Sequence, residues 1–292
     1  MAHEESLHNP EENLRIGFIG SGVMGEVMIK GLLDLRVVPP ERIWAAGPRS
    51  DRADELNTRY GIHGIQANRD AVANADLVVL SVKPQSLAKV LKEIKEVVEP
   101  RHLVLSIVAG ARMKVIGSGL AHPAIIRCMP NLPCQIHRGM TIWTSTPEVR
   151  EDQKAIARRI LRTMGAEYYV QDEVDVDRAT AVNGTGPAII AYIVKALEDA
   201  ALFIGESRPL ARESVLQTII GTAEMVLQSD RHVAELIDGV TSPGGTTSRA
   251  LHILSQGRMP AILTDAIDAA FQRSVELGRE LEAQVREANG EG

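Results

Sequence analysis

Residues 17–25 read Gly-Phe-Ile-Gly-Ser-Gly-Val-Met-Gly, and this stretch decides the fold of the N-terminal half. From Gly20 onward it has the form GxGxxG, directly after a short apolar run and at the start of a helical pattern. In that context the first glycine makes a tight turn, the second lets the backbone approach a diphosphate, and the third allows close packing of helix on strand. The free N–H groups at the helix start then hold the phosphates. We therefore predict a dinucleotide-binding turn whose cofactor contacts are Gly20, Gly22, Val23, Met24 and Gly25.

The chain around this turn alternates short apolar runs with amphipathic stretches. The run at 76–82 is unbroken and apolar, as expected for a strand that is buried on both faces. Strand patterns fall at 15–19, 42–46, 76–82, 103–107, 124–127, 142–143 and 167–170, and helical patterns at 23–33, 51–60, 86–97, 112–120 and 148–164. Strands that alternate with helices predict an α/β fold, a doubly wound and mostly parallel sheet of the Rossmann type, over residues 14–172.

After residue 172 the strand pattern stops. Helical patterns cover 187–204, 212–228 and 260–286, so we predict an all-α domain over residues 173–292. The first of these helices is apolar nearly all round, which is typical of a helix buried on every side. A domain of this size has little room to bury it alone, so we expect burial between subunits and a homodimer formed through the C-terminal helices. Residues 1–13 are polar and acidic, and we expect a flexible tail there.

Composition excludes several classes of protein. The 292 residues carry a net charge of −6 and only 3% aromatic side chains, which argues against binding nucleic acid. No apolar run is long enough to span a bilayer, and the first residues do not resemble a secretion signal, so we expect a cytoplasmic protein. Cys128 and Cys134 do not form a redox or metal motif, and we interpret them as buried thiols in a reducing compartment. We expect no metal site.

The end of the second predicted strand bears on which dinucleotide binds. An NAD site places Asp or Glu at this end, to bind the ribose hydroxyls. Here the strand is followed by Arg49 and Ser50, and the first acid is Asp51. A guanidinium and a hydroxyl suit a 2′-phosphate. We therefore expect NADPH, with NADH as the alternative in which Asp51 binds the ribose.

A second glycine-rich turn lies in the helical half, where Val240–Thr247 reads VTSPGGTT before another helical pattern. Two adjacent glycines allow successive N–H groups to point at one anion, and the following helix start adds its positive end. The pattern fits a carboxylate site. It is equally compatible with an ordinary turn that has a Ser/Thr cap.

These motifs together resemble the pyrroline-5-carboxylate reductase family. The resemblance covers nearly everything from Arg15 to about Leu281. It rests on GFIGSGVMG at 17–25, SVKPQ at 81–85, RCMPNLP at 127–133, NGTGPA at 183–188 and VTSPGGTT at 240–247. It implies an oxidoreductase that uses NAD(P)H to reduce the cyclic imine L-1-pyrroline-5-carboxylate to L-proline, the last step of proline biosynthesis. It also implies a dimer, sometimes assembled into a larger ring of dimers.

The resemblance assigns roles to particular residues. It implies that Thr247 is the catalytic residue, placed at the imine nitrogen. It implies that the substrate carboxylate is bound by Ser242, Gly244, Gly245 and Thr246. It places further cofactor contacts at Asn68, Val82, Lys83, Pro84, Ala109, Gly110, Met129 and Asn131. Lys83 could equally be a solvated loop lysine.

The chain departs from the family pattern at Leu132, Thr185 and Ile189, where the family usually has Thr, Ser and an aromatic residue. These changes leave room for a reductase of another cyclic imine carboxylate. A β-hydroxyacid dehydrogenase is a weaker alternative, because Lys195 follows Gly186 by nine residues and has no Asn on the next turn. A nucleotide-sensing module is the remaining alternative, and it would not need a carboxylate site.

Overall fold

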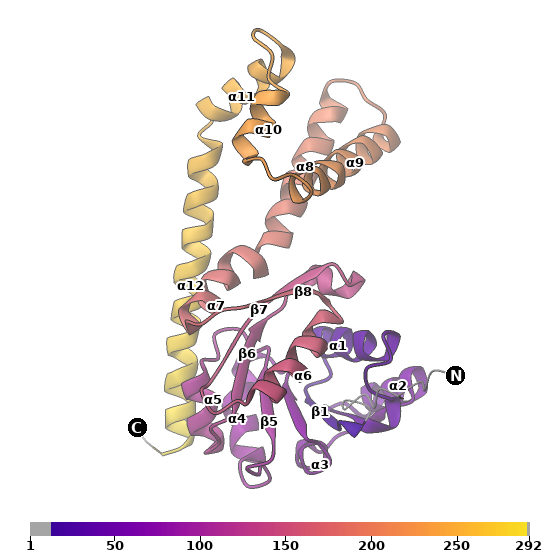
Figure 1. Cartoon of the computed structure of the whole chain (residues 1–292), viewed down its shortest axis with the longest axis vertical. Coiled ribbons are helices and arrows are strands. Elements are labelled where there is room, and N and C mark those ends of the chain that lie inside the picture. Colours follow the sequence, from indigo (N-terminus) through magenta and orange to yellow (C-terminus); the bar gives the residue numbers. More distant parts are fainter. Residues whose placement is uncertain (1–12, 291–292) are drawn as a thin grey trace, which may run out of the picture. The chain divides into compact units, whose positions relative to one another are not determined.

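The computed structural model describes residues 13–290 (Figure 1). The predicted flexible tail at 1–13 lies outside the described residues except for Asn13. Contacts divide the chain into two compact units, one of residues Met1–Thr185 and Ala270–Gly292, the other of Gly186–Ala269. This division falls after Thr185, and it assigns the last part of the chain to the first unit. The domain boundary between residues 172 and 173 stays a prediction.

The first unit is built on one eight-stranded sheet in the order β3-β2-β1-β4-β5-β6-β7-β8. Its strands are β1 (Ile16–Ile19), β2 (Ile43–Ala46), β3 (His63–Ile65), β4 (Leu77–Leu80), β5 (Leu103–Ser106), β6 (Ile125–Met129), β7 (Gly139–Ser145) and β8 (Gly165–Tyr169). Neighbouring strands are parallel except β6 and β7, which are antiparallel. The predicted Rossmann-type, mostly parallel sheet is confirmed.

Helices cover both faces of this sheet, because alternate side chains of each strand point to opposite faces. Phe18 and Val79 belong to the core on one face, and Ile19 and Val78 to the core on the other. The first core is covered by α1 (Val23–Asp34), α2 (Ser50–Tyr60) and α6 (Glu151–Arg162). The second is covered by α3 (Asn68–Ala73), α4 (Pro84–Ile94), α5 (Met113–Leu120) and the end of α12 (Met259–Ala288).

Short helices complete this unit. Two 3₁₀ helices lie at Pro40–Arg42 and Leu132–Ile136. After β8 the chain forms α7 (Glu173–Ala179) and then a π-helix, Thr180–Gly184. The sequence had not indicated either of these last two elements.

The second unit consists of helices and turns throughout its described residues, as predicted. They are α8 (Gly186–Phe203), α9 (Arg208–Leu227), α10 (Val233–Gly239), α11 (Thr246–Gln256) and the first part of α12. The apolar α8 buries none of its residues within one chain. Phe203, for instance, is 91% exposed. Among the described residues, no helix is sufficiently long and apolar to traverse a bilayer.

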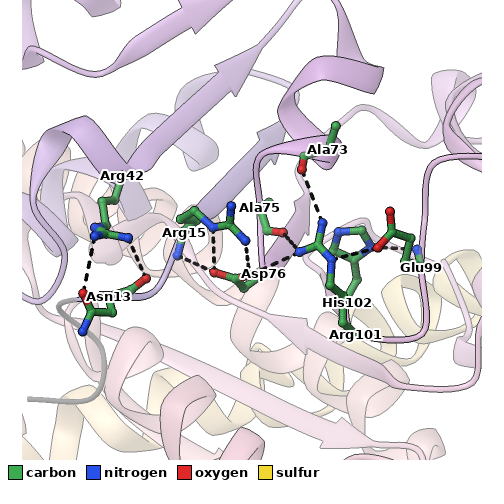
Figure 2. A network of polar contacts seen from close by, with 9 residues as sticks. All are labelled: Asn13, Arg15, Arg42, Ala73, Ala75, Asp76, Glu99, Arg101 and His102. Carbon is green, nitrogen blue, oxygen red and sulfur yellow. Dashed lines mark hydrogen bonds and ion pairs between the residues drawn. The ribbon is translucent and has the colours of Figure 1, made fainter.

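The amino ends of the central strands are joined by a polar network (Figure 2). Arg15, just before β1, donates to both carboxylate oxygens of Asp76, just before β4, at 3.0 and 2.7 Å. Arg101 donates to the carbonyl of Ala75 at 2.7 Å. Burial raises the pKa of Asp76, but the hydrogen bonds from Arg15 outweigh burial, so its net pKa is lowered. Ion pairs of Asp76 with Arg15 and Arg101 therefore join the strand ends at this edge of the sheet.

Candidate active site

The carboxyl edge of the sheet has the geometry of a dinucleotide site. The strand order reverses at β1, which pairs with β2 on one side and with β4 on the other. Ligands of open α/β sheets bind outside the carboxyl ends of the strands at this switch point. The loops that follow β1, β4, β5 and β6 all leave the sheet at this edge, and they carry most of the predicted cofactor residues.

The three glycines of the first turn each have a distinct steric reason. Gly20 has a φ of +101°, and a Cβ there would lie 2.7 Å from the carbonyl oxygen of Ser81. A Cβ at Gly25 would lie 2.8 Å from the carbonyl oxygen of Gly20, so α1 packs closely on this turn. At Gly22 a Cβ would meet nothing within 4 Å. Gly22 thus opens onto free space at the start of α1, which is where the sequence predicts a diphosphate.

Ser81 fixes this turn from the neighbouring strand end. Its N–H donates to the carbonyl of Ile19 at 2.9 Å, and its hydroxyl donates to the carbonyl of Gly20 at 2.6 Å. These two bonds join the loops after β1 and β4. Ser81 lies within the SVKPQ motif, but the sequence alone assigned it no role.

Arg52 is a second residue that sequence reasoning missed. Its side chain is only 12% exposed, and it donates through Nε to the carbonyl of Ser21 at 3.2 Å. The same guanidinium binds Glu26 of α1 and, at 2.6 Å, Glu55. Burial raises the pKa of Glu26, but hydrogen bonds from Tyr60 and Arg52 outweigh burial and lower the net pKa. An ionised Glu26 therefore holds α2 against the glycine turn through Arg52.

The predicted phosphate readers lie at the start of α2. Arg49 is the N-cap residue, and Ser50 is the first residue of the helix. The Arg49 side chain is 68% exposed, and its guanidinium is 3.8 Å from the carboxylate of Asp51. Unlike Arg52, Arg49 is thus free to turn toward a phosphate.

The remaining residues predicted at this edge differ in their surroundings. Asn68 begins α3 and donates to Glu93 at 2.9 Å. Lys83 is the exposed N-cap residue of α4, and Pro84 is its first residue. Val82 and Ala109 are half-buried in the loops after β4 and β5.

Gly110 packs against a helix. It has a φ of +75°, and a Cβ there would lie 3.2 Å from the backbone nitrogen of Gly278 in α12. This close approach of two backbones accounts for a glycine at position 110 without a ligand. Its role in cofactor binding stays a prediction.

Met129 and Asn131 end the series at the far side of this edge. Met129 is the last residue of β6. The Asn131 side chain accepts a hydrogen bond from the Met140 N–H at 2.9 Å and donates to Asn183 at 2.8 Å. Its amide is therefore held by protein groups, so Asn131 is better placed to fix its loop than to bind a ligand through this amide.

The predicted substrate residues come together in the second unit, between α10 and α11. Gly244 has a φ of +71°. The Gly245 N–H donates to the carbonyl of Ser242 at 3.0 Å and closes a tight turn. A Cβ at Gly245 would lie 2.4 Å from the hydroxyl oxygen of Ser242 and 3.2 Å from its carbonyl oxygen, so a larger residue there would force the Ser242 side chain to turn away. The Gly245 N–H is consequently engaged within the turn, which differs from its expected role as a free donor.

α11 begins directly after this turn. Gly245 is its N-cap residue and Thr246 its first residue, so the N–H groups of Thr246 and Thr247 lack intrahelical partners. The Thr247 side chain is half-buried, and its hydroxyl makes no hydrogen bond to other described residues. The helix start thus offers backbone donors and one hydroxyl to an anion.

Lys195, the residue on which the dehydrogenase alternative depends, lies on the exposed face of α8. It donates to Asp199 at 2.5 Å, and its side chain is 71% exposed. This is an ordinary surface ion pair one helical turn apart.

Comparison with known proteins places these features in one family. A family model described as pyrroline-5-carboxylate reductase dimerisation matches residues 173–277, and one described as NADP oxidoreductase, coenzyme F420-dependent, matches 15–110. The pyrroline-5-carboxylate reductase of Synechocystis is 36% identical, over 91% of this chain and 99% of the relative. That of Escherichia coli K12 is 34% identical, over 91% and 98%.

Solved structures agree with the sequence relatives. The chain superposes on a Plasmodium falciparum pyrroline carboxylate reductase with NADP bound, at a TM-score of 0.84 and 30% identity, over 91% of this chain and 99% of the other. For the pyrroline-5-carboxylate reductase of Coxiella burnetii the TM-score is 0.83 at 35% identity, over 90% and 98%. With the glycine turns, the sheet order and the helical half in agreement, the chain belongs to the pyrroline-5-carboxylate reductase family.

Proposed function

We propose that this protein reduces L-1-pyrroline-5-carboxylate to L-proline with NADPH, as the last step of proline biosynthesis. The observation that carries the proposal is the pair of glycine turns. One opens onto free space at Gly22, and the other leaves the start of α11 without intrahelical partners. Relatives named for this reaction, which this chain matches over 98–99% of their length, support it.

The cofactor would be held at the carboxyl edge of the sheet. Bound NADPH supplies a hydride, which adds to the imine carbon. The backbone around Gly20, Gly22 and Gly25 with the start of α1 would bind the diphosphate. Arg49 and Ser50 would bind the 2′-phosphate. The loop backbones that follow β4, β5 and β6 would flank the rest of the cofactor, with Asn68 at its adenosine side.

The substrate requires an anchor for its carboxylate and a hydrogen-bond donor for its nitrogen. Backbone N–H groups at Gly244 and Thr246, with the hydroxyl of Ser242, would bind the carboxylate. The Thr247 hydroxyl would hold a proton at the imine nitrogen, which makes the adjacent carbon a better hydride acceptor. The nitrogen ends protonated as the secondary amine of proline. Positioning and hydrogen bonding suffice for such a step, so neither a nucleophile nor a strong base is required.

Two further observations support proposals about assembly and location. We propose a homodimer formed through the C-terminal helices, because α8 buries none of its apolar side chains within one chain. A ring of such dimers would be a further level of assembly. We also propose a cytoplasmic location, since Cys128 and Cys134 are buried and unpaired, as is usual in reducing compartments.

The reaction is tested by NADPH oxidation with pyrroline-5-carboxylate, compared with NADH and with the six-membered imine carboxylate. Fast turnover with NADPH and the five-membered ring is expected. Preference for the six-membered ring would favour the alternative, a reductase of another cyclic imine carboxylate. Leu132, one of the departures from the family pattern, is 56% exposed. Tight NADPH binding without turnover of either ring would contradict the proposal.

Thr247→Val tests the proposed donor, because valine keeps the shape and removes the hydroxyl. We expect kcat to fall about 100-fold, the usual cost of losing one donor to developing charge, with NADPH affinity unchanged. Thr264→Val is the matched control, since the hydroxyl of Thr264 donates to the carbonyl of Pro260 within α12 at 3.0 Å. A Thr247→Val enzyme with the wild-type rate would remove this hydroxyl from the mechanism.

A further inference from the structure

The π-helix Thr180–Gly184 lies beside the end of β6. The N–H of Thr185 donates to the carbonyl of Thr180 at 3.2 Å, which is the five-residue spacing of a π-turn. Such turns are rare and occur frequently at functional sites. A Cβ at Gly184 would lie 3.0 Å from the terminal methyl carbon of Met129, so the π-helix packs directly on the last residue of β6.

Asn183 projects from this π-helix and joins three backbone segments. Its Nδ2 donates to the carbonyl of Met129 at 3.1 Å and to that of Met140 at 2.9 Å. Its Oδ1 accepts from Nδ2 of Asn131 at 2.8 Å. Asn131 in turn accepts from the Met140 N–H at 2.9 Å. Only a side chain that both donates twice and accepts can make this set of contacts, and an amide does so without a charge.

The loop that Asn183 holds begins after Met129 and leads away from β6 at the carboxyl edge of the sheet. β6 runs parallel to β5, so Met129 leaves the sheet at the same edge as Gly20 and Ser81. The loop after such a strand end is where a ligand of this fold is positioned. Both hydrogen-bonding atoms of the Asn131 amide are engaged by protein groups, so the loop's geometry is set from within the protein.

The segment before the π-helix is itself anchored to β6. Arg127 of β6 has a side chain that is 2% exposed, and it donates to Asp177 of α7 at 2.5 Å. Its other terminal nitrogen donates to Glu173 at 3.1 Å. The ion pairs fix α7 relative to the strand, and the π-helix follows α7 directly. Asn183 consequently approaches the loop from a fixed support.

We propose that Asn183 is a positioning residue for hydride transfer. Its amide holds the backbone of Met129 and, through Asn131, the loop that follows β6 in the geometry that places the nicotinamide for reaction. The inference rests on the function proposed above, in which the loop after β6 flanks the cofactor, and it takes the nicotinamide to be the part of the cofactor beside this loop. Asn183 itself touches neither cofactor nor substrate in this account, and it acts through the loop backbone.

Two variants and one control test whether the hydrogen bonds of Asn183 position the loop. Asn183→Asp keeps the size but points a carboxylate at two carbonyl oxygens, and Asn183→Ala leaves those carbonyls unpaired. Asn74→Asp makes the same chemical change at an exposed amide that donates to the carbonyl of Asp70 at 2.9 Å. We expect kcat to fall about 10- to 100-fold in both Asn183 variants, as for a misplacement of about 1 Å. NADPH affinity should stay within about threefold, because the lost interactions matter in the transition state.

Three further readouts separate positioning from a general loss of structure. The primary deuterium isotope effect on kcat should rise, since hydride transfer becomes slower than product release. In the cofactor-free protein, the Met140 amide should exchange with solvent faster than in the wild type. The fluorescence of bound NADPH should shift as the surroundings of the nicotinamide change. The Asn74→Asp protein should match the wild type in every measurement.

The outcomes distinguish this inference from the proposed function. A wild type that does not reduce pyrroline-5-carboxylate contradicts the proposed function, and the exchange and fluorescence measurements still decide whether Asn183 positions the loop because they need no substrate. Wild-type exchange at Met140, or an unchanged NADPH fluorescence, in both Asn183 variants overturns the inference. A fall in kcat that only parallels the loss of folded protein in thermal melts also overturns it.

Discussion

Two arginines stand near the glycine turn, and their environments separate their roles. Arg52 is 12% exposed and already bound to two carboxylates and a backbone carbonyl, so moving it to a phosphate would break its contacts with Glu26, Glu55 and the carbonyl of Ser21. Arg49 is 68% exposed, and its one ion pair is 3.8 Å long. Exposed pairs of this length contribute little free energy. We therefore propose Arg49 as the cation that binds the 2′-phosphate, whereas Arg52 supports the turn.

We expect Arg49→Ala to weaken NADPH binding by about 1–2 kcal/mol, the lower range for a charge-assisted hydrogen bond, because the site is open to solvent. NADH lacks the 2′-phosphate, so its affinity should not change. Titration of both cofactors against the variant checks this. Arg150→Ala is the control, since Arg150 is an exposed arginine paired with Asp152. Equal losses for NADH and NADPH would reject Arg49 as the phosphate reader.

The elements whose formation depends on local pattern could be predicted, and those that depend on distant partners could not. The buried strand around Val78 and the turn at Gly20 carry their signals in consecutive residues. By contrast, α7 is a short acidic helix, and its Glu173 and Asp177 pair with Arg127, which lies about 50 residues earlier in the chain. β3 has only three residues with Gly64 at its centre. Neither element shows apolar periodicity. α7 does have a local start signal, since the side chain of its N-cap residue Asp172 accepts a hydrogen bond from the Val174 N–H, but Asp forms such caps in ordinary turns as well.

The candidate site shows the same division. The glycine turns and the position of Arg49 follow from motifs with a known steric logic. The supporting contacts of Arg52, Ser81 and Asn183 join residues 31 to 61 positions apart, so a single sequence contains no periodic trace of them. Asn131 shows how far the sequence alone can lead. Its motif predicts a place near the cofactor, but the hydrogen bond from its amide to Asn183 exists only in the folded structure.

The ion pairs between β6 and α7 lead to a prediction about stability. Arg127→Met removes a buried cation and leaves Asp177, 4% exposed, with only the longer contact from Arg112 at 3.2 Å. We expect the free energy of unfolding to fall by about 3–5 kcal/mol, the typical cost of breaking a buried pair. Urea unfolding at fixed protein concentration measures it.

The matched comparison for this pair is Arg150→Met, which breaks the exposed pair with Asp152 and should leave the urea midpoint nearly unchanged. The double variant Arg127→Met, Asp177→Leu should recover part of the loss, because it removes the uncompensated buried charge. A single variant as stable as the wild type would show that the pair does not hold α7 in place.

Two buried histidines near the amino ends of the strands, His102 and His122, should make the free energy of unfolding depend on pH. His102, part of the network in Figure 2, accepts a hydrogen bond from the Glu99 N–H at 2.8 Å, so its Nδ1 must be unprotonated. His122 lies 2.8 Å from the His102 carbonyl. Burial lowers the pKa of both histidines; for His102 the charge of Arg101 lowers it further, while for His122 the bond to that carbonyl offsets burial only in part.

A histidine whose pKa is lowered in the folded state binds its proton first in the unfolded state. Stability should therefore be constant above about pH 6.5, the unfolded pKa, and fall as the pH drops below it. Each histidine contributes at most about 1.4 kcal/mol per pH unit. In urea unfolding between pH 7.5 and 5, His122→Gln should flatten this slope, and the exposed His252→Gln should not. An unchanged slope in His122→Gln would assign the acid sensitivity to other groups.

At the scale of the whole molecule, the two units differ in how far they bury their apolar side chains. The first unit buries them on both faces of its sheet, with Phe18 and Ile19 fully enclosed. The helices of the second unit leave theirs in solvent within one chain, including Phe203 at 91% and Leu227 at 85% exposure. Monomeric proteins rarely expose apolar surface on this scale. The match of residues 173–277 to a dimerisation domain agrees with this contrast and indicates that a second chain covers these helices.

Tyr192 of α8 provides the test, because it is 77% exposed on an apolar helix. We expect light scattering to give the wild type at least twice the mass of one chain. Tyr192→Glu would bury a carboxylate in the interface, which is costly without a partner, so the variant should dissociate at micromolar concentration. Its melting temperature should fall, since association stabilises the folded state by mass action. Leu35→Glu, at a 59% exposed position after α1, should remain assembled. A Tyr192→Glu protein that keeps the wild-type mass would show that α8 lies outside the interface, and the apolar faces of α9 and α12 would then have to form it.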